Sequence, residues 1–214
     1  MMSWDNAFGR CPLVAILRGV TPADAVPVVK ALLDEGFTIV EVPLNSPDAL
    51  NSIQQLSARF GAEAVIGGGT VLTSAQADQV HAAGGRLLVA PNFDLRVATA
   101  ARRLGMVYGP GTGTATEAFA ALEAGATFLK LFPAEMIPPA AVKALRAVLP
   151  AGAAILPVGG VTPENMESFV RAGANGFGLG SALYRPGATP SEVRLAARSF
   201  VKGWSTLQKT TPRG

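Results

Sequence analysis

Short apolar runs, many of them rich in β-branched residues, recur at intervals of roughly twenty residues and alternate with alanine- and leucine-rich stretches of helical period. Several helical stretches close on a small or acidic residue followed by glycine, which is a common way for a helix to end. We expect eight strands, over residues 13–17, 38–42, 64–67, 86–90, 106–108, 127–131, 154–158 and 176–179. Helices are expected to begin near Pro22, Pro47, Ser74, Asp94, Thr114, Pro139, Pro163 and Ser191.

This alternation of strands and helices predicts an α/β fold with parallel strands. About eight βα units in 214 residues suit a compact (β/α)8 TIM barrel, and we expect residues 1–214 to form one such domain. A doubly wound open sheet is the alternative, but it usually has fewer strands and a glycine fingerprint after the first one. In a barrel, the groups that act on a substrate lie at the carboxyl ends of the strands and in the loops that follow.

The composition indicates a folded protein with a large core. Hydrophobic residues make up 49% of the chain and charged residues 15%, which excludes a disordered chain. No apolar run reaches the roughly 18 residues of a membrane-spanning helix, and the first residues lack the pattern of a signal peptide. The single cysteine, Cys11, has no partner for an internal disulfide. We therefore expect a cytoplasmic protein that binds no membrane.

The formal net charge of +3 does not indicate a nucleic-acid partner, because the basic residues are scattered and few aromatic residues lie among them. Arg194, Arg198 and Lys202 recur at four-residue spacing on the predicted last helix. A solvated helix face explains this stripe more simply than a phosphate track does. The charge agrees at least as well with small anionic ligands.

The sequence lacks the residues for several kinds of chemistry. His81 is the only histidine, so no histidine cluster can hold a catalytic zinc or iron ion. The runs Gly109–Gly113 and Gly176–Ser181 both fail the glycine spacing of a dinucleotide-binding loop, and no P-loop is present. An enzyme with this sequence is expected to work without a cofactor or a metal ion.

Three charged residues lie at or near the carboxyl ends of predicted strands. Lys130 is the only lysine and Glu41 the only acidic residue inside a strand, each near its carboxyl end, and Arg18 ends the first strand. Buried charges are costly unless they are paired or used, and a Lys130–Glu41 ion pair that stabilises the barrel is one interpretation. We favour catalysis, in which a desolvated lysine of lowered pKa forms a Schiff base with a ketone. The carboxylate would then move protons, and Arg18 would bind a substrate carboxylate.

Glycines at the ends of the last two strands predict a phosphate site, because barrel enzymes commonly bind phosphate at these two positions. Gly160 and Gly180 let the backbone approach a ligand closely, and Ser181 adds a hydroxyl group. Tight turns with an ordinary helix cap are the alternative interpretation. Thr70, after the third strand, is either the cap of the next helix or a contact to the substrate carboxylate.

A resemblance to a known family is carried by eight segments in chain order: 14–19 (VAILRG), 40–47 (VEVPLNSP), 67–72 (GGGTVL), 90–92 (APN), 114–118 (TATEA), 129–133 (LKLFP), 158–163 (VGGVTP) and 178–181 (GLGS). Together they resemble the class I 2-dehydro-3-deoxy-phosphogluconate/phosphogalactonate aldolase family over nearly the whole chain. The resemblance implies a homotrimeric (β/α)8 lyase without a cofactor. Its substrate would be a phosphorylated 2-keto-3-deoxy sugar acid, cleaved into pyruvate and glyceraldehyde 3-phosphate.

The resemblance also implies a role for each matching residue. Phe132 would pack beside the imine, although a core role agrees equally well with the sequence. The remaining roles are the Schiff-base lysine (Lys130), the proton shuttle (Glu41), the contacts to the pyruvate carboxylate (Arg18 and Thr70) and the phosphate site (Gly160, Gly180 and Ser181).

The family divides by substrate, and one position separates its branches here. Gluconate-type members typically carry an arginine four residues after the catalytic glutamate, whereas this chain has Asn45 there and offers Arg18 from the first strand. That pattern resembles the galactonate-type branch, with the gluconate isomer as the alternative substrate of the same mechanism. Two further alternatives are a phosphosugar isomerase or epimerase that uses Glu41 as its base, and a sugar-phosphate-binding protein without catalysis.

Overall fold

The computed structural model describes residues 1–210, and residues 211–214 of the predicted domain lie outside the described part. Its strands are β1 (Leu13–Ile16), β2 (Ile39–Pro43), β3 (Val65–Gly69), β4 (Leu87–Val89), β5 (Val107–Gly109), β6 (Gly111–Thr112), β7 (Leu129–Leu131), β8 (Ile155–Pro157) and β9 (Phe177–Leu179). Its helices are α1 (Trp4–Arg10), α2 (Pro22–Asp34), α3 (Ala49–Phe60), α4 (Ser74–Ala82), α5 (Leu95–Arg103), α6 (Ala115–Glu123), α7 (Pro139–Arg146), α8 (Met166–Arg171) and α9 (Pro190–Thr210), with a 3-10 turn, η1 (Ala134–Met136).

The strands form two parallel sheets. One runs in the order β5-β4-β3-β2-β1-β9, and the other contains β6, β7 and β8. The chain passes between the sheets at Pro110, where a proline has no N–H group to continue a ladder. On the other side, an isolated bridge joins Val158, next to β8, to Gly178 in β9. The predicted α/β fold with parallel strands is confirmed, but these bonds do not by themselves close the ring of eight strands that the sequence predicts.

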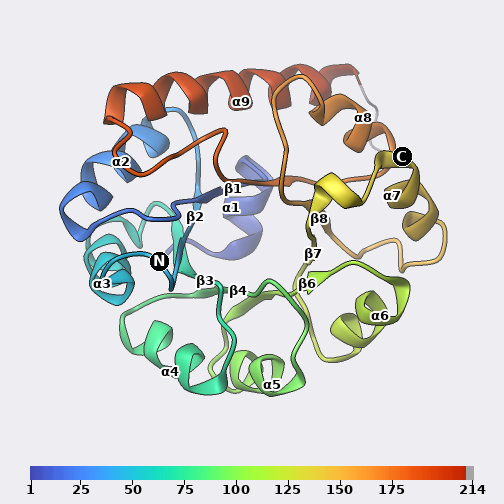
Figure 1. Cartoon of the computed structure of the whole chain (residues 1–214), viewed down its shortest axis with the longest axis horizontal. Helices are drawn as coiled ribbons and strands as arrows, with labels where there is room; N and C mark the ends of the chain where they lie inside the picture. Colours follow the sequence, from blue (N-terminus) through green and yellow to red (C-terminus); the bar gives the residue numbers. More distant parts are fainter. Residues whose placement is uncertain (211–214) are drawn as a thin grey trace.

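Helices α2 to α9 surround the strands, as Figure 1 shows. The predicted helix starts agree with the structure to within three residues, the largest difference being Pro163 against Met166 for α8. Two starts carry reciprocal capping, in which Thr73 pairs with Gln76 and Thr114 pairs with Glu117. None of the helices within residues 1–210 has the length and apolar character to cross a membrane.

The sequence analysis did not predict α1, which lies inside the ring of surrounding helices (Figure 1). Ser3 caps it, and the ring of Trp4 stacks on that of Phe128 with their centres 5.1 Å apart. Thr38, directly before β2, donates a 2.8 Å hydrogen bond from its hydroxyl to the Ala7 carbonyl. Because Thr38 and Phe128 precede their strands, α1 covers the amino ends of the strands and leaves the carboxyl ends for the site.

Side chains alternate along each strand between two apolar clusters. The outer cluster fills the space between strands and helices and includes Val40, Val42, Leu129 and Leu131. The intervening positions, Glu41 and Lys130, therefore belong to the inner face of the strands. The buried residues of the inner cluster are Ala7, Val14, Ile39, Val65, Leu87, Val89, Phe128 and Leu156.

Candidate active site

Lys130 lies in the middle of β7, and only 4% of its surface is exposed. The alternation of side chains places it on the inner face, two residues after Phe128 on the same side of the strand. Its Nζ atom lies 4.8 Å from the centre of the Phe132 ring, so the half-buried Phe132 packs against the amine. A primary amine is thus held among apolar groups, one residue before the carboxyl end of its strand.

Glu41 occupies the equivalent depth on β2 and is 1% exposed. Its Oε2 atom is buried and has no hydrogen-bond partner. The end of β3 borders this carboxyl group, because a Cβ atom on Gly69 would lie 2.7 Å from Glu41 Oε1. The missing side chain of Gly69 therefore makes room for the carboxyl group, and the unpaired oxygen is free to exchange a proton with a ligand.

Lys130 and Glu41 line one cavity on the inner face, so the structure brings these two candidate residues to the same place. The strands between them contribute apolar or small side chains, which leaves the amine and the carboxyl group as the ionisable groups of the cavity. The other lining residues are Val14, Ile16, Val89, Phe128, Leu156, Val158 and Gly178.

Burial dominates the ionisation of both groups. It lowers the pKa of the Lys130 ammonium below its ordinary value; the charge of Glu41 raises this pKa again, and that of Arg18 lowers it. Burial likewise raises the pKa of the Glu41 carboxyl, against the smaller effects of Lys130 and Arg18. A lysine with a lowered pKa supplies a neutral amine more readily, and a carboxyl group with a raised pKa can act as both acid and base.

Arg18 lies two residues beyond β1 and is exposed, and its charge influences the pKa of both Lys130 and Glu41. Its Nη1 atom donates a 2.7 Å hydrogen bond to Oδ1 of Asn45, in the loop after β2. The next backbone N–H, that of Gly19, donates a 2.9 Å hydrogen bond to the hydroxyl of buried Ser46. These two bonds fasten the loop that carries Arg18 to the loop that follows Glu41.

Thr70 directly follows Gly69 at the end of β3, where its φ of 55° is unusual for a residue other than glycine. The interpretation of Thr70 as the next helix cap is wrong, because Thr73 is the N-cap of α4. Thr70 is half-buried and stands next to the residue that borders Glu41. Backbone strain of this kind clusters at functional sites, so the φ of Thr70 indicates that its position matters for function.

The three residues of the predicted phosphate site lie on neighbouring strand ends. Gly160 follows β8 with a φ of 60°, and Gly180 and Ser181 follow β9. The bridge between Val158 and Gly178 holds the two ends side by side. Gly180 has no atom within 4 Å on the side where a Cβ would project, so its backbone is open to a ligand. Ser181 is exposed.

Within residues 1–210, no group of three or more His, Cys, Asp or Glu side chains is arranged to hold a metal ion. The groups available for chemistry here are the amine of Lys130, the carboxyl group of Glu41 and the guanidinium of Arg18. An amine, a proton shuttle and a carboxylate-binding cation together suit Schiff-base chemistry on a keto acid.

Comparison with known proteins identifies the group to which this architecture belongs. The model of the family described as KDPG and KHG aldolase matches residues 5–192. The chain belongs to the KDPG and KHG aldolase family. The 2-dehydro-3-deoxy-6-phosphogalactonate aldolase of Escherichia coli (strain K12) is 47% identical over 203 residues, which are 95% of this chain and 98% of that protein. The 2-dehydro-3-deoxy-phosphogluconate aldolase of Treponema pallidum (strain Nichols) is 32% identical over 170 residues, or 79% of this chain and 80% of that protein.

A solved structure described as native KDPGal superimposes on this chain with a TM-score of 0.92. The two are 46% identical, and the match covers 94% of this chain and 97% of that structure. The family resemblance seen in the sequence is therefore confirmed. The match spans nearly the full length of both chains, so the comparison concerns the whole fold rather than a shared motif.

The sequence analysis missed three residues that border the site in this KDPG and KHG aldolase. Gly69 and Ser46 were noted only within motifs, because their contacts join residues far apart in the chain. Glu135, in η1 after β7, lies against Gly159 and Gly160. Its position shortly after the strand that carries Lys130 was the one available signal.

Proposed function

We propose that this chain is a class I aldolase that cleaves 2-dehydro-3-deoxy-6-phosphogalactonate into pyruvate and glyceraldehyde 3-phosphate through a Schiff base on Lys130. The observation that carries the proposal is the burial of Lys130 and Glu41 in one apolar cavity on the inner face. Membership of an aldolase family supports the reaction class. Carbon–carbon cleavage next to a ketone needs an electron sink, and a protonated imine supplies one.

The neutral amine of Lys130 attacks the C2 carbonyl of the keto acid to form a carbinolamine, which loses water to give the imine. Glu41 donates the proton that the departing hydroxyl group needs. The carboxylate then takes the proton of the C4 hydroxyl as the C3–C4 bond breaks, and glyceraldehyde 3-phosphate leaves. Glu41 returns this proton to C3 of the remaining enamine, and water hydrolyses the pyruvate imine to free the lysine.

Arg18 and Thr70 bind the carboxylate of the keto acid in this proposal. The guanidinium offers a planar pair of donors, and its bond to Asn45 fixes its direction. The hydroxyl of Thr70 adds a donor from the end of β3. Phe132 packs against the amine and shields the imine from water.

The phosphate group is bound by the backbone at Gly160 and Gly180 and by the hydroxyl of Ser181. The left-handed φ of 60° at Gly160 and the open space beside Gly180 support this assignment. Two adjacent strand ends that finish in glycine let backbone N–H groups approach a ligand closely, which suits a dianion better than a neutral group.

Two observations favour the galactonate isomer over the gluconate isomer. The chain is more similar to the phosphogalactonate aldolase of Escherichia coli (strain K12) than to the phosphogluconate aldolase of Treponema pallidum (strain Nichols), at 47% against 32% identity. The guanidinium of Arg18 is also held on Asn45, at the position where gluconate-type members carry their own arginine. The two substrates differ at one hydroxyl-bearing carbon, so small differences in the cavity decide between them.

The proposal includes a closed (β/α)8 barrel, in which β5 and β6 act as one strand interrupted at Pro110, and β8 and β9 meet at the bridge from Val158 to Gly178. It also includes a homotrimer. Leu95 and Phe119, on α5 and α6, are 63% and 45% exposed, which leaves apolar surface for a subunit interface. Light scattering of the purified protein tests the trimer directly.

Turnover of the two 6-phosphate isomers, measured side by side with a coupled assay for the aldehyde, tests the proposed function. We expect faster cleavage of the galactonate isomer. Faster cleavage of the gluconate isomer would reverse the branch and keep the mechanism. Isomerisation of a phosphosugar without release of aldehyde would support the isomerase alternative, and binding without turnover would support the sugar-phosphate-binding alternative.

A further inference from the structure

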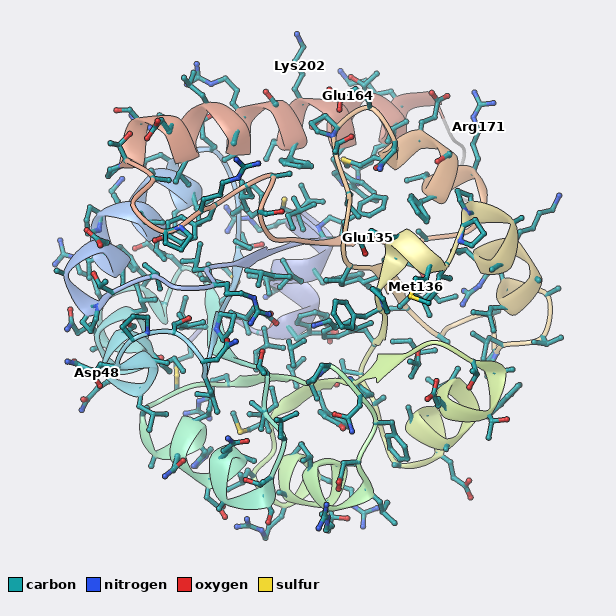
Figure 2. The ribbon with its side chains drawn as sticks, viewed as in Figure 1. Asp48, Glu135, Met136, Glu164, Arg171 and Lys202 are labelled. Atoms are coloured by element: carbon teal, nitrogen blue, oxygen red, sulfur yellow. The ribbon has the colours of Figure 1, made fainter. Side chains whose placement is uncertain are left out.

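Glu135 lies at the proposed phosphate site, although neither the family motifs nor the reaction assigns it a role. It belongs to η1, the single turn that follows β7, and its neighbour Ala134 donates a 2.9 Å backbone hydrogen bond to the Val158 carbonyl. This bond docks the turn against the end of β8. Figure 2 shows Glu135 close to the middle of the view, with Met136 beside it, whereas Glu164 lies further out toward α9.

The side chain of Glu135 covers the two glycines that end β8. A Cβ atom on Gly159 would collide with its carboxylate, and one on Gly160 would lie 2.8 Å from its Cγ atom. Both glycines have left-handed backbone, with φ of 109° and 60°. The carboxylate therefore occupies space directly above the backbone that would hold the substrate phosphate.

The glycine segment and the side chain of Glu135 differ in how far they can move. Asn165 clamps the glycine segment, because its side chain donates a 2.8 Å bond to the Gly160 carbonyl and accepts a 3.0 Å bond from the Thr162 N–H. Glu135 is exposed, and none of the hydrogen bonds within residues 1–210 holds its carboxylate. A phosphate group that enters this place would displace the side chain rather than the loop.

We propose that Glu135 is a specificity residue that gates the phosphate site by charge. Its carboxylate holds the place of the phosphate in the free enzyme and has to turn out to solvent when a phosphorylated ligand binds. The like charges weaken the binding of phosphorylated ligands, including the aldehyde product and inorganic phosphate, and leave pyruvate untouched. The gate would thus speed release of the phosphorylated product. This inference rests on the proposed function, because it assigns the phosphate to this loop.

The test compares Glu135→Gln, Glu135→Ala and the wild type in inhibition of sugar-acid cleavage by inorganic phosphate. Both variants remove the charge from an exposed side chain, so both should fold. We expect the inhibition constant of phosphate to fall roughly 3- to 10-fold in both, as for removal of a like charge at the rim of a site. The fraction of Lys130 trapped by pyruvate and borohydride should stay unchanged. Glu164→Gln is the matched control, since it removes the same charge from an exposed residue nearby without touching the glycines.

Three results would overturn the gate. An inhibition constant that rises in both variants would mean that the carboxylate braces the loop, and one within twofold of the wild type in both would mean that it has no influence. An equal fall of the inhibition constant in Glu164→Gln would mean that the effect comes from the net charge of the protein, and it would also overturn the gate. Failure of the proposed function is separate: the wild type would then neither trap pyruvate nor cleave either isomer, and direct titration of inorganic phosphate into the same three proteins would still decide the gate.

Discussion

Nη1 of Arg18 and Oδ1 of Asn45 are joined by a 2.7 Å hydrogen bond that links the loops after β1 and β2. The two residues are 27 positions apart, and the bond sets the direction of an otherwise exposed guanidinium. Arg18 can bind the substrate carboxylate in the proposed way only if it keeps this direction.

Asn45→Ala should therefore weaken binding of the keto acid without removing any ionisable group. We expect KM to rise roughly 3- to 10-fold with little change in kcat, because one charge-assisted orienting bond is lost. Asn51→Ala, which removes a surface amide from α3, is the control and should leave KM unchanged. A fall in kcat with constant KM would place Asn45 in the chemical step instead.

Glu41→Gln should separate pyruvate binding from turnover. The amide keeps the shape of the carboxyl group but cannot move protons, so kcat should fall by about 10²-fold or more while pyruvate still binds. Steady-state kinetics and trapping of the pyruvate adduct, performed on the same preparation, measure the two effects. Glu63→Gln, at an exposed turn, serves as the control for the loss of one negative charge. Near-normal turnover in Glu41→Gln would exclude Glu41 as the shuttle.

Gly69→Ala should damage the site without unfolding the protein. The added methyl group would lie 2.7 Å from Oε1 and 2.9 Å from Cδ of Glu41, so the carboxyl group has to shift. A misplaced shuttle should lower kcat on the order of 10- to 100-fold. Gly9→Ala, at a helical glycine with no atom within 4 Å of the added carbon, should leave kcat unchanged. Equal activity of the two variants would show that Glu41 does not need its present position.

The pH dependence of imine formation should reveal the lowered pKa of Lys130. Burial favours the neutral amine, so the rate of imine formation with pyruvate should reach its plateau at lower pH than for an ordinary lysine, with a pKa of about 10.4. The charge of Glu41 raises the pKa of Lys130, and the midpoint should therefore move to still lower pH in Glu41→Gln. A midpoint at the ordinary lysine value, or a shift to higher pH in the variant, would contradict this account.

Much of the fold and of the site follows from the sequence, because charged residues are rare inside buried strands. The few that occur there therefore stand out. Lys130 and Glu41 could be singled out because each interrupts an apolar run that has to be buried on both faces. The helix starts were readable from their caps, as at Thr114. The break between the two sheets at Pro110 could not be predicted from the sequence. A proline shows which hydrogen-bond ladder it interrupts only once the neighbouring strands are known.

The features that were missed depend on contacts between distant parts of the chain. The seven residues of α1 form a helix that is held by the stack of Trp4 on Phe128 and not by its own length. The bond from the Gly19 N–H to Ser46 joins two loops, and the contact of Glu135 with Gly159 joins two strand ends. Local patterns carry no record of such pairs, so only the packed structure reveals them.

Reduction by borohydride in the presence of pyruvate, followed by mass spectrometry of the digested protein, tests the central claim most directly. The account predicts one reduced pyruvate unit on Lys130 in the wild type and in Lys143→Arg, which changes an exposed lysine of α7, and none in Lys130→Arg. A protein that remains unmodified under saturating pyruvate, or an adduct carried by another lysine, would contradict it.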